Sequence, residues 1–83
     1  MANPPFRPVE LCIQPPNAYR SIRTVRDAIQ ALLEHWSYEM QKGKPFERAC
    51  KACLDAMEND GCAEKARWAF LRAANAAGLT IRV

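Results

Sequence analysis

Two cysteines at a C-x-x-C spacing are the residues of this chain best suited to chemistry. Cys50 and Cys53 have the spacing of a redox dithiol, or of two ligands of a zinc ion. A redox motif places its first cysteine near a helix N-terminus, whereas both cysteines here fall in an apolar helical stripe with Phe46, Leu54 and Met57. The sequence has no second C-x-x-C and no pair of histidines to complete a zinc site. We therefore expect both thiols to be buried, reduced and unligated, and we expect no cofactor or metal.

The other residue types form no recognisable catalytic set. His35 is the only histidine, and it stands at the border of a predicted apolar helix face, which is typical of a boundary side chain. No serine or cysteine accompanies a base and a carboxylate at a catalytic spacing, and the acidic residues are spread over predicted helix exteriors. We therefore expect the chain not to be an enzyme.

Three arginines near the start of the first predicted helix suggest a candidate anion site. Arg20, Arg23 and Arg26 could bind a phosphate or a nucleic-acid backbone with the free N–H groups of the helix end. The alternative is a solvated surface, partly neutralised by Asp27. Twelve Lys and Arg against nine Asp and Glu give a net charge of only +3, and no aromatic residues alternate with the arginines. Weak nucleic-acid or anion binding is therefore an alternative to the main hypothesis.

Both ends of the chain have the alternating pattern of β-strands. Residues 9–14 alternate between apolar and polar side chains, which predicts a half-buried strand, and the Pro-Pro-Asn at 15–17 predicts a turn. Residues 19–23 then form a second strand of a hairpin, although Arg20 would share its apolar face. Residues 79–83 alternate again and predict a last strand.

Three helices are predicted between these strands. Thr24 is the N-cap of the first, whose apolar stripe continues to a Lys-Gly end at residues 42–43. Pro45 begins the second, Asp60 caps the third, and Gly78 ends it. The residues predicted to form the core are Ile22, Leu32, Trp36, Phe46, Leu54 and Phe70, with Leu11 or Ile13.

This element order predicts an α+β fold. An N-terminal β-hairpin, three helices and a C-terminal strand would form a small sheet covered by helices. The alternative is a three-helix bundle with marginal strands. With 83 residues and 9.4 kDa, the chain has room for one domain, which we place at residues 9–83, after a flexible Pro-rich arm at residues 1–8.

The first residues and the hydropathy pattern indicate the compartment. Residues 1–8 lack the basic start and the apolar stretch of a secretory signal. The longest apolar runs are a few residues, against the roughly 20 that a transmembrane helix needs. We therefore expect a soluble, cytoplasmic protein with no membrane contact, in which the four cysteines are reduced.

The whole pattern resembles a bacterial family called domain of unknown function 982. The most specific part is an Ala-Arg-x-Ala-Phe-x-x-Ala-Ala segment, which reads here from Ala66 to Ala74 and is followed by Ala77-Gly78. Because that family has no assigned activity, the resemblance implies one small domain spanning Phe6 to Val83 and no particular role. The other features that carry it are Phe6-Arg7-Pro8-Val9, Ile22, Ala28, Leu32 or Leu33, Trp36, Cys53 and Ala56.

A tryptophan on the polar side of the third helix is the strongest indication of a binding surface. At about 100° per residue, Trp68 points almost opposite the apolar face that contains Phe70, with Leu71 beside it. Three alternatives remain: the arm at residues 1–8 covers it, it is simply exposed, or it is the centre of a partner or self-association surface with Arg67 and Arg72 as a basic rim. The main functional hypothesis is thus a small, non-enzymatic protein-interaction or regulatory module.

Overall fold

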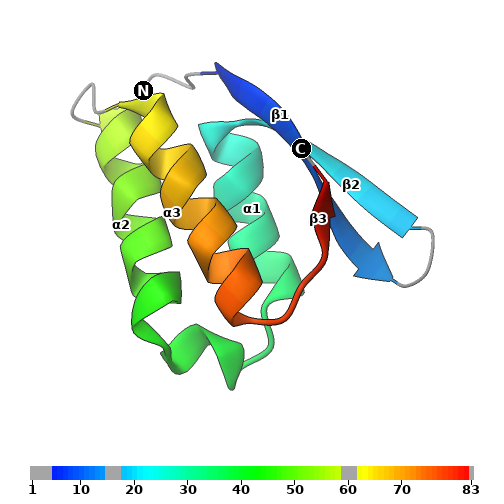
Figure 1. The fold of residues 1–83 in the computed structure, drawn as a ribbon. Helices are drawn as coiled ribbons and strands as arrows, with labels where there is room; N and C mark the ends of the chain where they lie inside the picture. The colour runs from blue at the N-terminus through cyan, green and yellow to red at the C-terminus, as the bar shows by residue number, and fades with distance from the viewer. Residues whose placement is uncertain (1–4, 15–17, 59–61, 83) are drawn as a thin grey trace.

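The computed structural model describes residues 5–14, 18–58 and 62–82 (Figure 1). The β-strands form one antiparallel sheet in the order β2-β1-β3. The predicted α+β fold is therefore confirmed, and the three-helix bundle with marginal strands is excluded. The elements in chain order are β1 (Pro5–Gln14), β2 (Ala18–Thr24), α1 (Val25–His35), the short 3-10 helix η1 (Met40–Lys42), α2 (Lys44–Glu58), α3 (Ala63–Ala76) and β3 (Ile81–Arg82).

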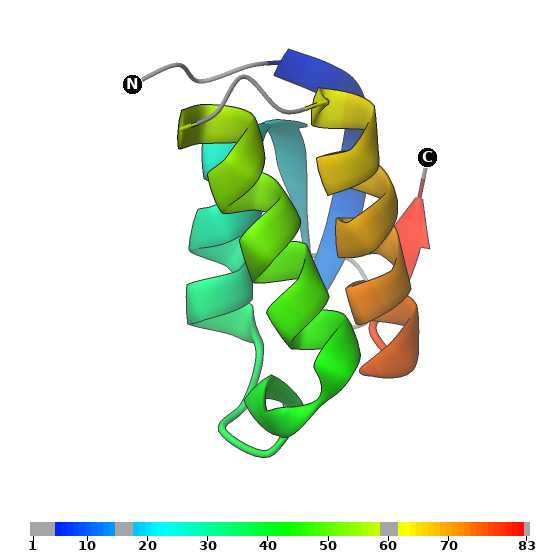
Figure 2. The same ribbon diagram turned by 90° about the vertical axis from the view of Figure 1, so that its left-hand side faces the viewer.

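The helices cover one face of the sheet in two layers. Helices α1 and α3 pack on the sheet, and α2 packs on both of them from the side away from the sheet (Figure 2). Small side chains let the helices approach closely, because Ala28, Ala49, Ala66 and Ala73 are all buried at these contacts. The largest fully buried side chains are Phe70, Leu11, Ile22, Leu32, Val9, Val25 and Cys53.

Strand β1 begins earlier than the alternating pattern predicts. It starts at Pro5 rather than Val9, and Phe6 is only 8% exposed within the core. The pairing of β1 with β2 shifts between Pro5 and Val9, and this irregularity lets both Phe6 and Val9 face the core despite their odd spacing. Residues 5–8 of the predicted arm therefore belong to the sheet. Residues 1–4, the predicted turn at 15–17 and Val83 lie outside the described residues.

The start of α1 is as predicted. The Thr24 hydroxyl accepts a hydrogen bond from the Asp27 amide at 3.2 Å, and the Asp27 carboxylate accepts one from the Arg23 amide, also at 3.2 Å. The first bond satisfies an amide that the helix itself leaves unpaired, and the second pairs the amide of Arg23 at the end of β2. They also fix the angle at which the chain leaves β2 and enters α1.

The end of α1 differs from the prediction of a helix that continues to Lys42. Trp36 is already extended, with φ −92° and ψ 126°, so the helix stops at His35. The Gln41 side-chain amide donates to the Trp36 carbonyl oxygen at 3.1 Å, and the Ser37 hydroxyl accepts from the Met40 amide. These local bonds compete with further helical turns, so the helix ends about two turns before the end of the apolar stripe.

Most of the predicted core is confirmed, with one exception. Ile22, Leu32, Trp36 and Phe70 are buried and Phe46 is half-buried, but Leu54 is 47% exposed. Of the pair Leu11 or Ile13, Leu11 is the buried member and Ile13 is 41% exposed. Helix α2 turns its small residues Ala49, Cys53 and Ala56 inward, so Leu54 points outward. The pairing of β1 is irregular between Cys12 and Gln14, which interrupts the alternation at Ile13.

Gly78 ends α3 as predicted, because it adopts a positive φ of 76° that other residues rarely take. The Leu79 amide donates to the Ala74 carbonyl oxygen at 2.9 Å, and the Gly78 amide donates to that of Asn75 at 3.1 Å. This pair of bonds is a Schellman motif, which turns the chain back toward the sheet. At the other end of α3, the predicted cap Asp60 lies outside the described residues, and Cys62 occupies the N-cap position.

Candidate functional site

Trp68 lies on the solvent side of α3. Ala66 and Phe70, two residues before and after it, face the core, so the helical rotation of about 200° turns the indole away from the core. The Trp68 side chain is 60% exposed. Phe6, which would fold back over it if the arm were the cover, is buried in the core instead. Of the alternatives left open for Trp68, cover by the arm is therefore not the one seen in the described part of the chain.

The indole lines an open groove between α2 and α3, which we call the Trp68 groove. It has a volume of about 370 Å³. On α3, its lining residues follow the i, i+3, i+4, i+7 spacing of one helix face, which places them in a row beside the start of α2. The lining residues are Pro45 and Arg48 from α2, and Lys65, Trp68, Ala69 and Arg72 from α3.

Every described charged residue that lines the Trp68 groove is a cation. Arg48, Lys65 and Arg72 are exposed, and none of the three forms an ion pair with another residue in the described ranges. No described carboxylate lines the groove. Of the three cations, only Arg72 was predicted. Lys65 shares its helix face with Trp68 in the sequence, whereas Arg48 is brought there by the packing of α2.

Arg67 and Leu71, the other two residues of the predicted partner surface, do not line the groove. Arg67 is only 8% exposed, and its Nε donates to the Arg7 carbonyl oxygen at 3.2 Å. Leu71 is half-buried against the edge of the core. On α3, Arg67 stands between Ala66, which faces the core, and Trp68, which faces solvent. Its side chain extends toward β1, where it bonds Arg7, and not toward α2. The rim that was predicted from Arg67 is therefore wrong, and Arg67 connects α3 to the sheet.

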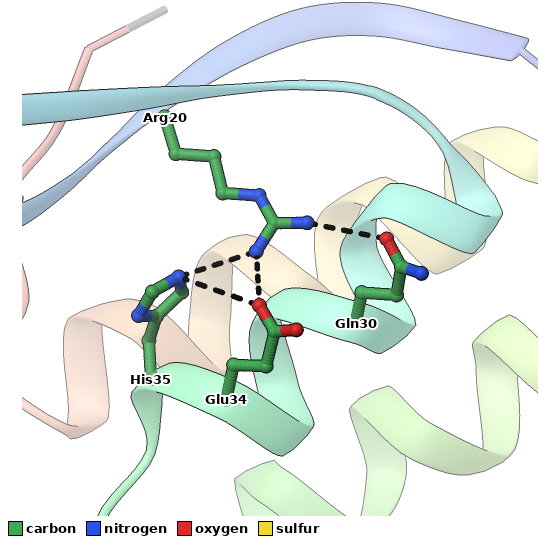
Figure 3. A network of polar contacts seen from close by, with 4 residues as sticks. All are labelled: Arg20, Gln30, Glu34 and His35. Carbon is green, nitrogen blue, oxygen red and sulfur yellow. Dashed lines mark hydrogen bonds and ion pairs between the residues drawn. The ribbon is translucent and has the colours of Figure 1, made fainter.

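The structure does not bring the three arginines of the predicted anion site together. Arg20 pairs across the sheet with Leu11 and so lies on the face covered by the helices, where it reaches α1 (Figure 3). Arg23 is on the opposite, open face of the sheet, in a shallow depression with Glu10 and Ser21. Arg26 is exposed on the first turn of α1. Because Arg20 and Arg23 lie on opposite faces of the sheet, the three side chains cannot converge on one anion.

Arg20 is occupied by contacts within the protein. Its guanidinium donates to the Glu34 carboxylate at 2.6 Å and to the Gln30 side-chain oxygen at 3.2 Å. It also lies 3.2 Å from His35 Nε2 (Figure 3). The fork of the guanidinium thus ties the edge strand β2 to the second half of α1. This explains why a cation on the apolar face of β2, which the sequence pattern left unexplained, is accommodated there.

The two thiols of the C-x-x-C differ in environment. Cys53 is fully buried, as predicted, and desolvation together with the neighbouring Cys50 raises its pKa to about 12. Cys50 is only half-buried, which corrects the expectation for that residue, and desolvation raises the pKa of its thiol as well. Raised pKa values keep both groups as thiols near neutral pH, the opposite of the thiolate that a redox motif needs.

Metal-ligand groups do not gather in the described part of the chain. No group of three or more His, Cys, Asp or Glu side chains there is placed to hold a metal ion. The carboxylate of Glu10, on the open face of the sheet, is paired with Arg82 at 2.9 Å. The Arg82 guanidinium also lies 4.0 Å from the ring centre of Tyr19. On this face, Glu10 and Arg82 therefore neutralise each other, whereas the described charged residues of the Trp68 groove are all cations.

Comparisons with known proteins identify a family but no relative of known role. The family model described as protein of unknown function (DUF982) matches residues 7–81, nearly the full length of the chain. This match confirms the resemblance inferred from the sequence. Neither the curated proteins nor the solved structures include a significant match to the chain. Among the described residues, no helix combines the length and the apolar character needed to cross a bilayer.

Proposed function

For this chain, which belongs to the DUF982 family of proteins of unknown function, we propose a role as a small protein-interaction or regulatory module with no enzymatic activity of its own. One observation carries the proposal: a tryptophan that is 60% exposed stands in a groove between two helices. Large aromatic side chains contribute more binding energy at protein interfaces than most other residue types. A domain of this size also uses most of its apolar residues in its core, so a tryptophan left outside it suggests a binding role.

The chemistry of the remaining residues supports a binding role rather than catalysis. The thiols of Cys50 and Cys53 have raised pKa values, and His35 is in contact with Arg20. Among the arginines proposed for weak nucleic-acid or anion binding, Arg20, Arg23 and Arg26, the first two lie on opposite faces of the sheet. Nothing in the arrangement favours that alternative, so the interaction module is the only function proposed.

The proposal is tested by removing the indole and comparing the captured proteins. Wild-type chain, Trp68→Ala and Leu33→Ala are immobilised in parallel and exposed to an extract of the native cells. Leu33, on α1, is 64% exposed and lies outside the Trp68 groove, so its variant controls for the loss of any exposed apolar side chain. We expect a protein that wild type and Leu33→Ala capture and that Trp68→Ala does not. Identical capture by all three chains would contradict the proposal.

A further inference from the structure

We propose that the partner of the Trp68 groove is an acidic, amphipathic helical segment of another protein, an inference that rests on the proposed function above. The groove offers an aromatic side chain and a row of cations, and it lies between two helices. Each of these three features restricts the chemistry of what can bind.

The first restriction is charge. Arg48, Lys65 and Arg72 surround the indole, and no described carboxylate lines the groove or pairs with any of the three. Some cations elsewhere in the described chain do pair with acids: Arg20 binds Glu34, and Arg82 binds Glu10. A ligand that supplies carboxylates would compensate three neighbouring positive charges at once, whereas a basic ligand would add to their repulsion.

The second restriction excludes a symmetric dimer of this chain built on the groove. In a symmetric dimer built on this surface, each groove would face its own equivalent, because a two-fold interface pairs the same patch on both subunits. Arg48, Lys65 and Arg72 would then confront the same three cations of the other copy. The chain as a whole carries a net charge of +3, which opposes such an encounter at longer range as well.

The third restriction is shape. The groove runs between α2 and α3, where Pro45 near the start of α2 lies beside Arg72 near the end of α3, so the two helices are antiparallel there. A third helix fits such a groove by inserting its ridge of side chains between the two. Apolar residues on one face of that helix would contact Trp68 and Ala69, and acidic residues on its flanks would reach the cations.

A single-stranded nucleic acid satisfies the charge restriction but fits the groove less well. Proteins that bind such strands stack successive bases on several aromatic side chains, and Trp68 is the only aromatic residue that lines this groove in the described part of the chain. The floor that remains consists of Pro45 and Ala69, which suit an apolar side chain better than a base.

The inference is tested with three labelled probes and the full chain. The first is a synthetic helical peptide of about 18 residues, five turns long, with Leu on one face and Glu elsewhere. The second has Lys in place of every Glu, and the third is an oligothymidylate of about 12 nucleotides. Binding is followed by anisotropy of the probe label. The emission of Trp68 is followed too, because the only other tryptophan, Trp36, is buried. We expect the Glu peptide alone to bind, with a blue shift of Trp68 emission and with an affinity that falls as salt is added.

A matched pair of charge reversals locates the contact. Lys65→Glu changes a cation of the groove, and Lys51→Glu makes the same change of net charge at an exposed position of α2 that does not line it. We expect Lys65→Glu to weaken Glu-peptide binding about 10-fold or more and Lys51→Glu to weaken it less than about 2-fold. Both residues are exposed, so neither change removes core packing, and circular dichroism verifies the fold.

Each other outcome overturns the inference. Equal binding of the Lys peptide would show an apolar groove without charge selection, and tighter binding of the oligothymidylate would indicate a nucleic-acid ligand. Equal weakening of Glu-peptide binding by Lys51→Glu would show that the net charge of the chain, and not the groove, determines the affinity. Absence of binding by the Glu peptide would show that an acidic helix is not the partner. These failures are distinguishable from failure of the proposed function, because the extract experiment with Trp68→Ala uses no acidic probe.

Discussion

The side chain of Arg67 on α3 donates a hydrogen bond from Nε to the main-chain carbonyl oxygen of Arg7 on β1, over 3.2 Å. The two residues are 60 positions apart in the sequence, and Arg67 is the one buried charged residue in the described part of the chain. The bond therefore connects the last helix to the first strand at the position where β1 begins its irregular pairing with β2.

We expect Arg67→Ala to lower the free energy of unfolding by about 2 kcal/mol, because a bond from a charged donor is lost along with buried packing of the side chain. Chemical unfolding of the purified variant measures this. Arg72→Ala is the matched control, since Arg72 is exposed on the same helix, and it should change stability by less than about 0.5 kcal/mol. Equal stability of the two variants would contradict the role given to Arg67.

Trp36 joins the short segment after α1 to the core. Its ring lies 5.7 Å from that of Phe70 and 6.4 Å from that of Phe46, both in tilted geometry. We expect Trp36→Ala to cost about 3–5 kcal/mol of unfolding free energy, a large part of what so small a domain has. Thermal unfolding tests this against Tyr38→Ala, whose ring is 75% exposed nearby. If Trp36→Ala unfolded at the same temperature as Tyr38→Ala, the contacts of Trp36 with Phe70 and Phe46 would not stabilise the core.

Removing the contacts of Arg20 should lower the unfolding free energy by less than removing Trp36. Its partner Glu34 has a side chain that is 58% exposed, so solvent screens the ion pair, and we expect Arg20→Ala to cost about 1 kcal/mol. Arg20→Lys should recover only part of this, because an ammonium group cannot donate in a fork to both Glu34 and Gln30. Urea unfolding measures both variants, with Arg23→Ala on the open face of the sheet as control. Full recovery by Lys would mean that charge alone matters there.

The sequence was sufficient to predict the element order because each boundary has a local chemical cause. Thr24 caps α1 with its own hydroxyl, and Gly78 ends α3 because its backbone takes a positive φ. By contrast, the end of α1 depends on bonds from Ser37 and Gln41 that compete with a continuing helix. Apolar spacing does not reveal such competition, so the stripe predicts a helix to Lys42 although α1 ends at His35.

The candidate site could be predicted only in part, for a related reason. Helical rotation from Phe70 is enough to place Trp68 on the outside. The same rotation does not say which neighbouring helix lies beside it, and this is what brings Arg48 into the groove. Nor does it show that Arg67 reaches a carbonyl group 60 positions away. Contacts between distant segments therefore cannot be predicted from the helical pattern of one segment.

The four cysteines should react with a thiol reagent in the order of their exposure. Cys62 is exposed and should be labelled first, Cys50 is half-buried and should be slower, and Cys12 and Cys53 are buried and should wait for unfolding. Mass spectrometry after timed labelling of the native protein resolves the order. Cys62→Ser should remove the fast phase alone. Rapid labelling of Cys53 in the native protein would contradict its burial between the helices.

The buried thiol of Cys53 also predicts how stability changes with pH. Desolvation, with a contribution from Cys50, raises its pKa in the folded protein from 9.0 to about 12. Between these two values the unfolded chain loses the Cys53 proton while the folded chain keeps it, so the unfolded state gains stability and the unfolding free energy falls as pH rises. Other groups titrate in this range too, so the quantity to measure is the difference in unfolding free energy between wild type and Cys53→Ala. We expect this difference to be largest near about pH 8 and to shrink toward about pH 11. A Cys53 difference that does not depend on pH would show that this thiol titrates alike in the folded and unfolded chains.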